Sequence, residues 1–200
     1  MANPDYEIIQ RILGGEKRAY AQLIDRHKDR AMTLALRMLK NREDAEEALQ
    51  DAFVRAFNAL PRFEWKSSFS TWFYRIVYNV CATILNRRGD EQFTSVHDDE
   101  EGPQELPSTD VLPDSDYENT EFSQIVKQEI DKLPAVYASM LTLFLVQDMS
   151  YDEIVEATGL PLGTVKVRLF RARGMLRDNV VAVLDEGYNN SNQRRVALKP

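Results

Sequence analysis

The residues best suited to chemistry form a cluster of cations between positions 162 and 177. No acidic residue interrupts the cluster, and its spacing spreads the cations over the outer faces of one helix. Guanidinium and ammonium groups on a helix suit DNA phosphates, and arginine can also read base edges in the major groove. The pattern therefore indicates nucleic-acid binding rather than a reaction centre. The cations are Lys166, Arg168, Arg171, Arg173 and Arg177.

A helix-turn-helix pattern contains this cluster. Ser150 and Glu153 are spaced as a capping box, and Gly159 can take the left-handed conformation that a short turn between helices needs. The second helix has an apolar stripe, predicted to be buried, and an outer surface that fits the major groove. The stripe is Val165, Leu169, Ala172 and Leu176. On the outer surface, Thr164, Val167 and Arg171 are expected to face base edges, with Phe170 beside them, and Lys166, Arg168 and Arg173 to face phosphates.

A second candidate surface combines aromatic and polar residues between positions 69 and 79. Helical spacing puts Thr71, Arg75 and Asn79 on one face, with Trp72 and Tyr78 beside it. Rings that stack, amides that read base edges and a cation for phosphate suit unpaired bases. The alternative is that the aromatic residues only fill the core, as Phe69, Phe73, Ile76, Val80 and Ile84 are expected to do.

The elements that must position these surfaces are all predicted to be helices, because no alternating β-branched runs occur. We expect an all-α fold of two small domains, residues 1–88 and 121–185, joined by an acidic, proline-containing linker, 89–120. Residues 89–124 hold 12 acidic residues and no Lys or Arg, within a chain of net charge −7. Residues 186–200 are predicted to be a disordered tail. Helices are expected at about 17–39, 45–60 (capped by Asp44), 69–87, 121–132, 135–147, 151–157 and 162–185.

Composition excludes several other classes. The single cysteine, Cys81, rules out an internal disulfide framework and a cysteine-based zinc site, and no motif suggests a cofactor. No apolar run approaches the roughly 20 residues of a membrane span. We therefore expect a cytoplasmic protein without catalytic residues, metal or cofactor, and with Cys81 as a small buried hydrophobe.

Three motifs occur in an order that resembles one family. The stretch from Asp44 to Phe57 (DAEEALQDAFVRAF) precedes Phe69 to Ile76 (FSTWFYRI), and Ser150 to Ile154 (SYDEI) and Gly163 to Arg173 (GTVKVRLFRAR) follow the linker. This order is similar to that of bacterial RNA polymerase sigma factors of the extracytoplasmic-function (ECF) type, over roughly residues 5–185. The alternative is a free-standing helix-turn-helix repressor or activator, which has no need of the first two motifs.

The resemblance implies roles for each domain. The first would bind the clamp helices of the largest polymerase subunit and the melted −10 promoter element. The second would bind duplex −35 DNA and the flap of the second large subunit, and an anti-sigma factor is a common partner. The core-binding residues would be Gln50, Asp51, Val54 and Arg55; the −10 residues Trp65, Lys66, Ser67, Thr71, Trp72, Arg75, Tyr78 and Asn79; and the −35 residues Thr164, Lys166, Val167, Arg168, Phe170, Arg171 and Arg173.

Three positions depart from the family pattern. Trp65 stands where the family often has glycine, in the loop expected to hold a flipped base, so this chain can differ in −10 specificity. Phe73 and Val155 replace a usual leucine and alanine, and both are changes of core size that neighbouring side chains can accommodate.

Overall fold

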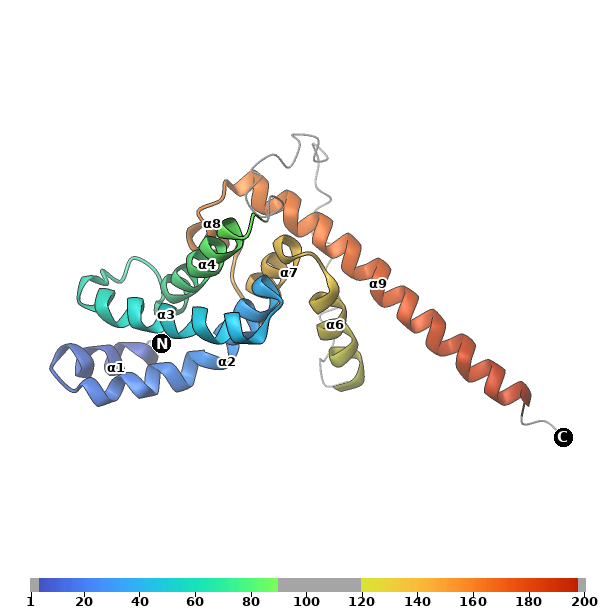
Figure 1. Ribbon diagram of the computed structural model, residues 1–200, viewed down its shortest axis with the longest axis horizontal. Coiled ribbons are helices and arrows are strands. Elements are labelled where there is room, and N and C mark those ends of the chain that lie inside the picture. Colours follow the sequence, from blue (N-terminus) through green and yellow to red (C-terminus); the bar gives the residue numbers. More distant parts are fainter. Residues whose placement is uncertain (1–3, 90–119, 198–200) are drawn as a thin grey trace.

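The computed structural model describes residues 4–89 and 120–197, so nearly all of the predicted acidic linker lies outside the described residues. Within these ranges the chain is helical and contains no strand (Figure 1). The first unit consists of α1 (Pro4–Leu13), a 3-10 turn (Lys17–Ala19), α2 (Tyr20–Leu39), α3 (Arg42–Ala59), a second 3-10 turn (Leu60–Arg62) and α4 (Phe69–Arg87). The second consists of α6 (Thr120–Lys132), α7 (Ala135–Leu141), a π-helical turn (Thr142–Val146), α8 (Tyr151–Thr158) and α9 (Leu162–Ala197).

Aromatic rings fill the centre of the first unit. Phe73 of α4 is fully buried and stacks on Phe53 of α3, with 4.6 Å between ring centroids. Phe69 stacks parallel to Phe73 at 5.9 Å, and His27 of α2 lies against both rings. Apolar residues at helical spacing along α3 and at the start of the following turn are buried, as amphipathic packing requires. They are Leu49, Phe53, Ala56 and Leu60.

The start of α3 differs from the prediction, which made Asp44 the capping residue. Asn41 is the N-cap: its backbone is extended, and its side-chain oxygen accepts a hydrogen bond from the Asp44 N–H at 3.0 Å. Asparagine caps as well as aspartate does, so the helix begins at the earlier of the two candidates. Asp44 instead lies in the first turn and forms an ion pair with Arg88 at 2.7 Å.

The helix-turn-helix of the second unit matches its prediction. Ser150 and Glu153 form a complete capping box, and Gly159 ends α8 with φ of 73°. The stripe Val165, Leu169, Ala172 and Leu176 is buried throughout. The prediction of one helix over 135–147 was wrong in detail, because α7 gives way to a π-helical turn in which the Gln147 N–H donates to the Thr142 carbonyl at 3.1 Å.

Helix α9 is longer than its pattern predicted. We expected it to end at Asp185, but it continues to Ala197 and projects away from the rest of the chain (Figure 1). No proline stops it, and Gly187 alone does not end a helix. Side chains are described only as far as Asp185.

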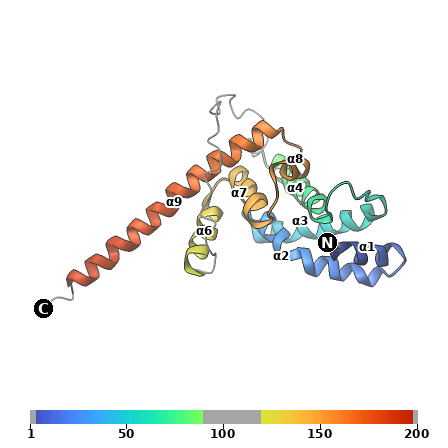
Figure 2. The ribbon, with the colours of Figure 1, turned by 180° about the vertical axis from the view of Figure 1, so that it is seen from behind.

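The two units pack directly against each other. Helix α8 lies along α4, and α7 lies against α2, as views from both sides show (Figures 1 and 2). Arg37 of α2 joins the units: its Nε donates to an Asp131 carboxylate oxygen at 2.8 Å, and its terminal nitrogen donates to the Thr142 hydroxyl at 3.0 Å. Lys40 donates to the Asp131 carbonyl at 2.7 Å, and the Gln147 amide donates to the Arg30 carbonyl at 3.0 Å.

Candidate nucleic-acid interface

The N-terminal half of α9 presents most of the residues predicted to bind duplex DNA. Its orientation is set by the buried stripe and by the Gly159 turn, which together fix α9 against α8. Phe170 is 43% exposed on the outer surface. The predicted residues that are half-buried are Thr164, Lys166, Val167, Arg171 and Arg173. Five of the seven are therefore partly accessible to a ligand, Phe170 is exposed, and Arg168 is not accessible.

Two of the predicted phosphate-binding arginines contact the protein itself. Arg168 is only 2% exposed and lies near Tyr78 of α4. Burial raises the pKa of Tyr78 to about 12, although the neighbouring Arg168 cation acts in the opposite direction. The guanidinium of Arg173 lies 4.6 Å from the centre of the Phe144 ring, a cation–π arrangement. In this arrangement Arg168 cannot reach a phosphate.

Helix α4 divides the residues predicted to bind unpaired bases between two faces. Arg75 and Asn79 are exposed and Trp72 is half-buried, one or two turns apart on the same face. Thr71 and Tyr78 lie on the face that the second unit covers, and they are 1% and 4% exposed. The Thr71 hydroxyl donates to a Glu153 carboxylate oxygen of α8 at 3.2 Å. The exposed face is therefore accessible to a ligand in this arrangement, whereas the covered face is not.

The loop between positions 63 and 68 carries the other predicted base-binding residues, and its end is defined by a cap. Ser68 is the N-cap of α4 and accepts a hydrogen bond from the Thr71 N–H at 3.0 Å. Lys66 is exposed and pairs with Glu64, and Ser67 is half-buried. The loop is thus anchored on α4, with its cation facing solvent.

Trp65 has a left-handed backbone, with φ of 58°. A bulky residue in this region costs on the order of 1–3 kcal/mol, whereas glycine adopts it without strain. Glycine would therefore be free of strain at this position, which Trp65 occupies in this chain. The Trp65 ring packs between Tyr6, at 5.0 Å, and Phe63, at 4.7 Å, and these contacts offset the strain.

The candidate polymerase-binding residues share one surface of α3. Val54 is 59% exposed, and Gln50 is exposed one turn earlier. Asp51 and Arg55 form an ion pair at 2.7 Å beside Val54. The surface therefore offers an apolar centre with a polar margin, an arrangement typical of protein interfaces.

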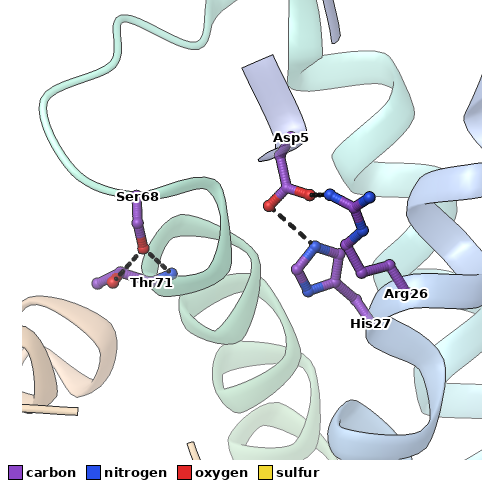
Figure 3. A network of polar contacts seen from close by, with 5 residues as sticks. All are labelled: Asp5, Arg26, His27, Ser68 and Thr71. Atoms are coloured by element: carbon purple, nitrogen blue, oxygen red, sulfur yellow. Dashed lines mark hydrogen bonds and ion pairs between the residues drawn. The ribbon is translucent and has the colours of Figure 1, made fainter. Parts of the chain in front are cut away.

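A buried polar network fixes α1 on α2. The Asp5 carboxylate is 4% exposed and bridges Arg26 at 2.9 Å and the His27 Nε2 at 3.1 Å (Figure 3). Burial by itself raises the pKa of Asp5, but hydrogen bonds and charge from His27 and then Arg26 bring this pKa below its ordinary value. The carboxylate is therefore stabilised in its charged form in the folded chain.

We expect Asp5→Asn to destabilise the first unit at neutral pH by about 1–2 kcal/mol, because the charge-assisted bonds to α2 are lost. Since the folded-state pKa of Asp5 is lowered, this contribution is complete above the unfolded pKa of about 3.9 and is lost as the pH falls below it. Urea unfolding between pH 7 and pH 3 measures the difference between the two chains. Asp25→Asn, which alters an exposed pair with Lys28, is the matched control. A difference that grows as the pH falls would contradict the assignment.

Three features of this region were not predicted from the sequence. Tyr6 was not predicted, and its available sequence signal was only an aromatic residue next to an acidic one near the start of the first helix. The hydrogen bonds of Arg37 between the two units and the contact between Thr71 and Glu153 are the other two features. They join residues more than 80 positions apart, so no local sequence pattern predicts them.

A helical unit with an aromatic–polar face, joined to a helix-turn-helix unit, is the architecture of a DNA-binding transcription factor. The family models for Sigma-70 region 2 and Sigma-70 region 4 match residues 23–91 and 123–176. The region 2 match accounts for the front half of the chain, which a free-standing repressor does not need. The chain belongs to the ECF RNA polymerase sigma factors, which direct transcription initiation at promoters.

Known relatives are similar to this chain over most of its length. The ECF RNA polymerase sigma factor SigW of Bacillus subtilis is 32% identical over 173 residues, which covers 84% of this chain and 92% of SigW. In fold, the chain resembles CnrH, solved in complex with the cytosolic domain of CnrY (TM-score 0.58, 23% identity, 91% of this chain and 97% of that chain). It also resembles the sigma factor RpoE of Bartonella quintana, solved with the anti-sigma factor NepR (TM-score 0.57, 22% identity, 80% and 96%). In the described part of the chain, no helix has the length and apolar character to cross a membrane.

Proposed function

We propose that the two units bind one promoter in two different states. The outer surface of α9 binds the −35 element as duplex, and the exposed face of α4 with the 63–68 loop binds the −10 element as unpaired strand. The observation that carries this proposal is the exposure of Arg75 and Asn79 beside the half-buried Trp72, because amide, cation and ring suit a base that has left the duplex. Binding unpaired bases better than paired ones shifts the melting equilibrium toward the open promoter.

The proposal requires the two units to separate on DNA. Arg168, Thr71 and Tyr78 are buried where α9 and α8 meet α4, so neither predicted surface is complete in the present arrangement. We call the present arrangement, in which the two units pack against each other, the closed arrangement. Promoter DNA and the contacts of the closed arrangement then compete for the same side chains. The closed arrangement is thereby a DNA-free state of this sigma factor.

We further propose the partners that this function needs. Core RNA polymerase binds the Val54 surface of α3 through the clamp helices of its largest subunit, and the second unit through the flap of the second large subunit. The polymerase supplies all catalytic groups, and this chain supplies none. An anti-sigma factor is a third partner, supported by the fold shared with two sigma factors solved in complexes, one of them with an anti-sigma factor. The protein acts in the cytoplasm. The genes whose transcription it directs serve a stress- or envelope-related response.

The proposal is tested by run-off transcription from a promoter library with purified core polymerase. The unaltered chain is expected to select promoters that share −35 and −10 elements. Arg171→Ala should weaken binding to a duplex −35 probe and relax its base preference, by about 1–3 kcal/mol per lost base contact. Asn79→Ala should leave that binding intact but reduce permanganate reactivity of thymines in the −10 element, because strand opening is impaired.

A matched control is Phe122→Ala, which removes an exposed aromatic side chain on α6 outside both predicted surfaces. If Asn79→Ala weakened binding to the duplex −35 probe and left strand opening unchanged, the assignment of α4 to the single strand would fail. If the chain selected no promoters with core polymerase, the two-state proposal as a whole would fail.

A further inference from the structure

Four aromatic rings form a continuous row from α1 to α4. Tyr6 contacts Trp65, Trp65 contacts Phe63 at 4.7 Å, and Phe63 contacts Trp72 at 4.9 Å. The rings come from three separate segments: α1, the 63–68 loop and α4. The far end of the row, Trp72, borders the face of α4 that the proposed function assigns to unpaired bases. The near end, Tyr6, is 49% exposed and has no assigned role.

The buried network of Asp5 sets the position of Tyr6. Asp5 is the preceding residue of α1, and its bonds to Arg26 and His27 hold the first turn of that helix on α2 (Figure 3). With α1 held in this way, the Tyr6 ring lies 5.0 Å from the Trp65 ring, inclined by 50°. Tyr6 is thus a pre-positioned ring on the surface rather than a mobile side chain of a chain terminus.

Trp65 provides a second observation. Its left-handed backbone is strained for a tryptophan, and strain of this kind concentrates at binding sites. The strained conformation places the indole between Tyr6 and Phe63 in the row, where it remains half-buried.

The surroundings contain exposed cations that suit an anionic polymer with flat, apolar parts. Arg62 and Lys66 are exposed next to Phe63 and Trp65 in the sequence, with Lys66 paired to Glu64, and the Arg26 side chain is 42% exposed and paired to Asp5, the neighbour of Tyr6. Stacked rings bordered by cations form the general pattern of single-stranded DNA surfaces. The row is also continuous with the proposed −10 surface through Phe63 and Trp72.

We propose that Tyr6 and Trp65 form a stacking platform for one further unpaired DNA base, adjacent to the bases bound by α4. The occupant is a base of the melted non-template strand, and Tyr6 stacks on it while Asp5 positions Tyr6 through α2. This inference rests on the proposed function, because it extends the single-strand surface of the first unit onto α1.

The experiment uses holoenzyme assembled from the full chain and core polymerase. Its probe is fork-junction DNA with 5-iodouracil placed at one position of the unpaired strand at a time. Irradiation is expected to cross-link one such position to Tyr6 or Trp65, identified by mass spectrometry. In parallel, Tyr6→Leu should shorten the lifetime of the fork-junction complex by about tenfold, and Tyr6→Phe should recover most of it, because stacking needs the ring.

The control on the same helix is Leu13→Ala, since Leu13 is 45% exposed on α1 and distant from the ring row in sequence. It should leave the lifetime unchanged. If Tyr6→Leu retained the full lifetime while Trp72→Leu lost it, the platform would be refuted and the proposed function would stand. If both variants retained it, the single-strand role of the first unit would fail together with the platform. Absence of cross-links to Tyr6 and Trp65 at every probe position would refute the platform in the unaltered chain.

Discussion

Arg37→Ala is expected to open the closed arrangement. The Arg37 side chain is 5% exposed, and its guanidinium bonds both Asp131 and Thr142 across the contact between the two units. Removing it loses two charge-assisted hydrogen bonds and leaves a void. Asp131 is 60% exposed and is readily rehydrated, so the net loss is about 2 kcal/mol, or roughly 25-fold in the ratio of closed to open chains.

Fluorescence energy transfer between the two units measures this shift. Cysteines introduced at the exposed positions Asn58 and Asp178 can carry the dyes. The native Cys81 is fully buried, and burial raises the pKa of its thiol to about 12, so it does not compete for the label. Energy transfer should fall in Arg37→Ala, and binding of a duplex −35 probe should strengthen because Arg168 becomes accessible.

The matched control for this prediction is Arg42→Ala. Arg42 forms an exposed ion pair with Glu46 within α3, so its loss removes an arginine without touching the contact between units. Unchanged energy transfer in both variants would show that the Arg37 bridge does not hold the units together.

Phe73→Ala is expected to lower the free energy of unfolding of the first unit by about 3–5 kcal/mol. The ring is fully buried and contacts Phe53, Phe69, Tyr74 and His27, so its removal leaves a cavity that these rigid rings cannot fill. Phe73→Leu restores the residue usual in the family and should cost less than about 1.5 kcal/mol, since neighbouring side chains can adjust to a smaller change of volume.

Tryptophan fluorescence during urea unfolding measures this loss selectively. Both tryptophans of the chain, Trp65 and Trp72, belong to the first unit, so their emission reports its unfolding separately from that of the second. Phe122→Ala, at a 42% exposed position of α6, is the control and should leave the transition in place. Equal transitions for Phe73→Ala and the unaltered chain would refute Phe73 as the centre of this core.

Local patterns predicted the helices and the helix-turn-helix because their causes are local. Spacing determined the buried stripe of α9, and Ser150 with Glu153 and Gly159 determined where α8 begins and ends. The cap of α3 was misassigned because Asn41 and Asp44 are both capable of capping, and only the backbone conformation distinguishes them. The resemblance of the motifs to the ECF family was confirmed by the family models and the relatives.

Features that depend on the packing of the two units could not be predicted from periodicity. Arg168 follows the rule for an outward cation on a DNA-binding helix, yet it is buried near Tyr78 of α4. The exposed or covered state of Thr71 likewise depends on α8, which is distant in sequence. The left-handed backbone of Trp65 contradicts the preference of its residue type, so only the structure reveals it.

Glu153 uses its two carboxylate oxygens for different purposes. One oxygen accepts bonds from the Ser150 N–H at 2.9 Å and hydroxyl at 3.0 Å and thereby begins α8, whereas the other accepts the Thr71 hydroxyl. Withdrawal of α4 therefore breaks a bond to only one oxygen, and the first turn of α8 keeps its cap. The beginning of α8 is therefore fixed within the second unit itself, and separation of the two units costs that unit no helix cap.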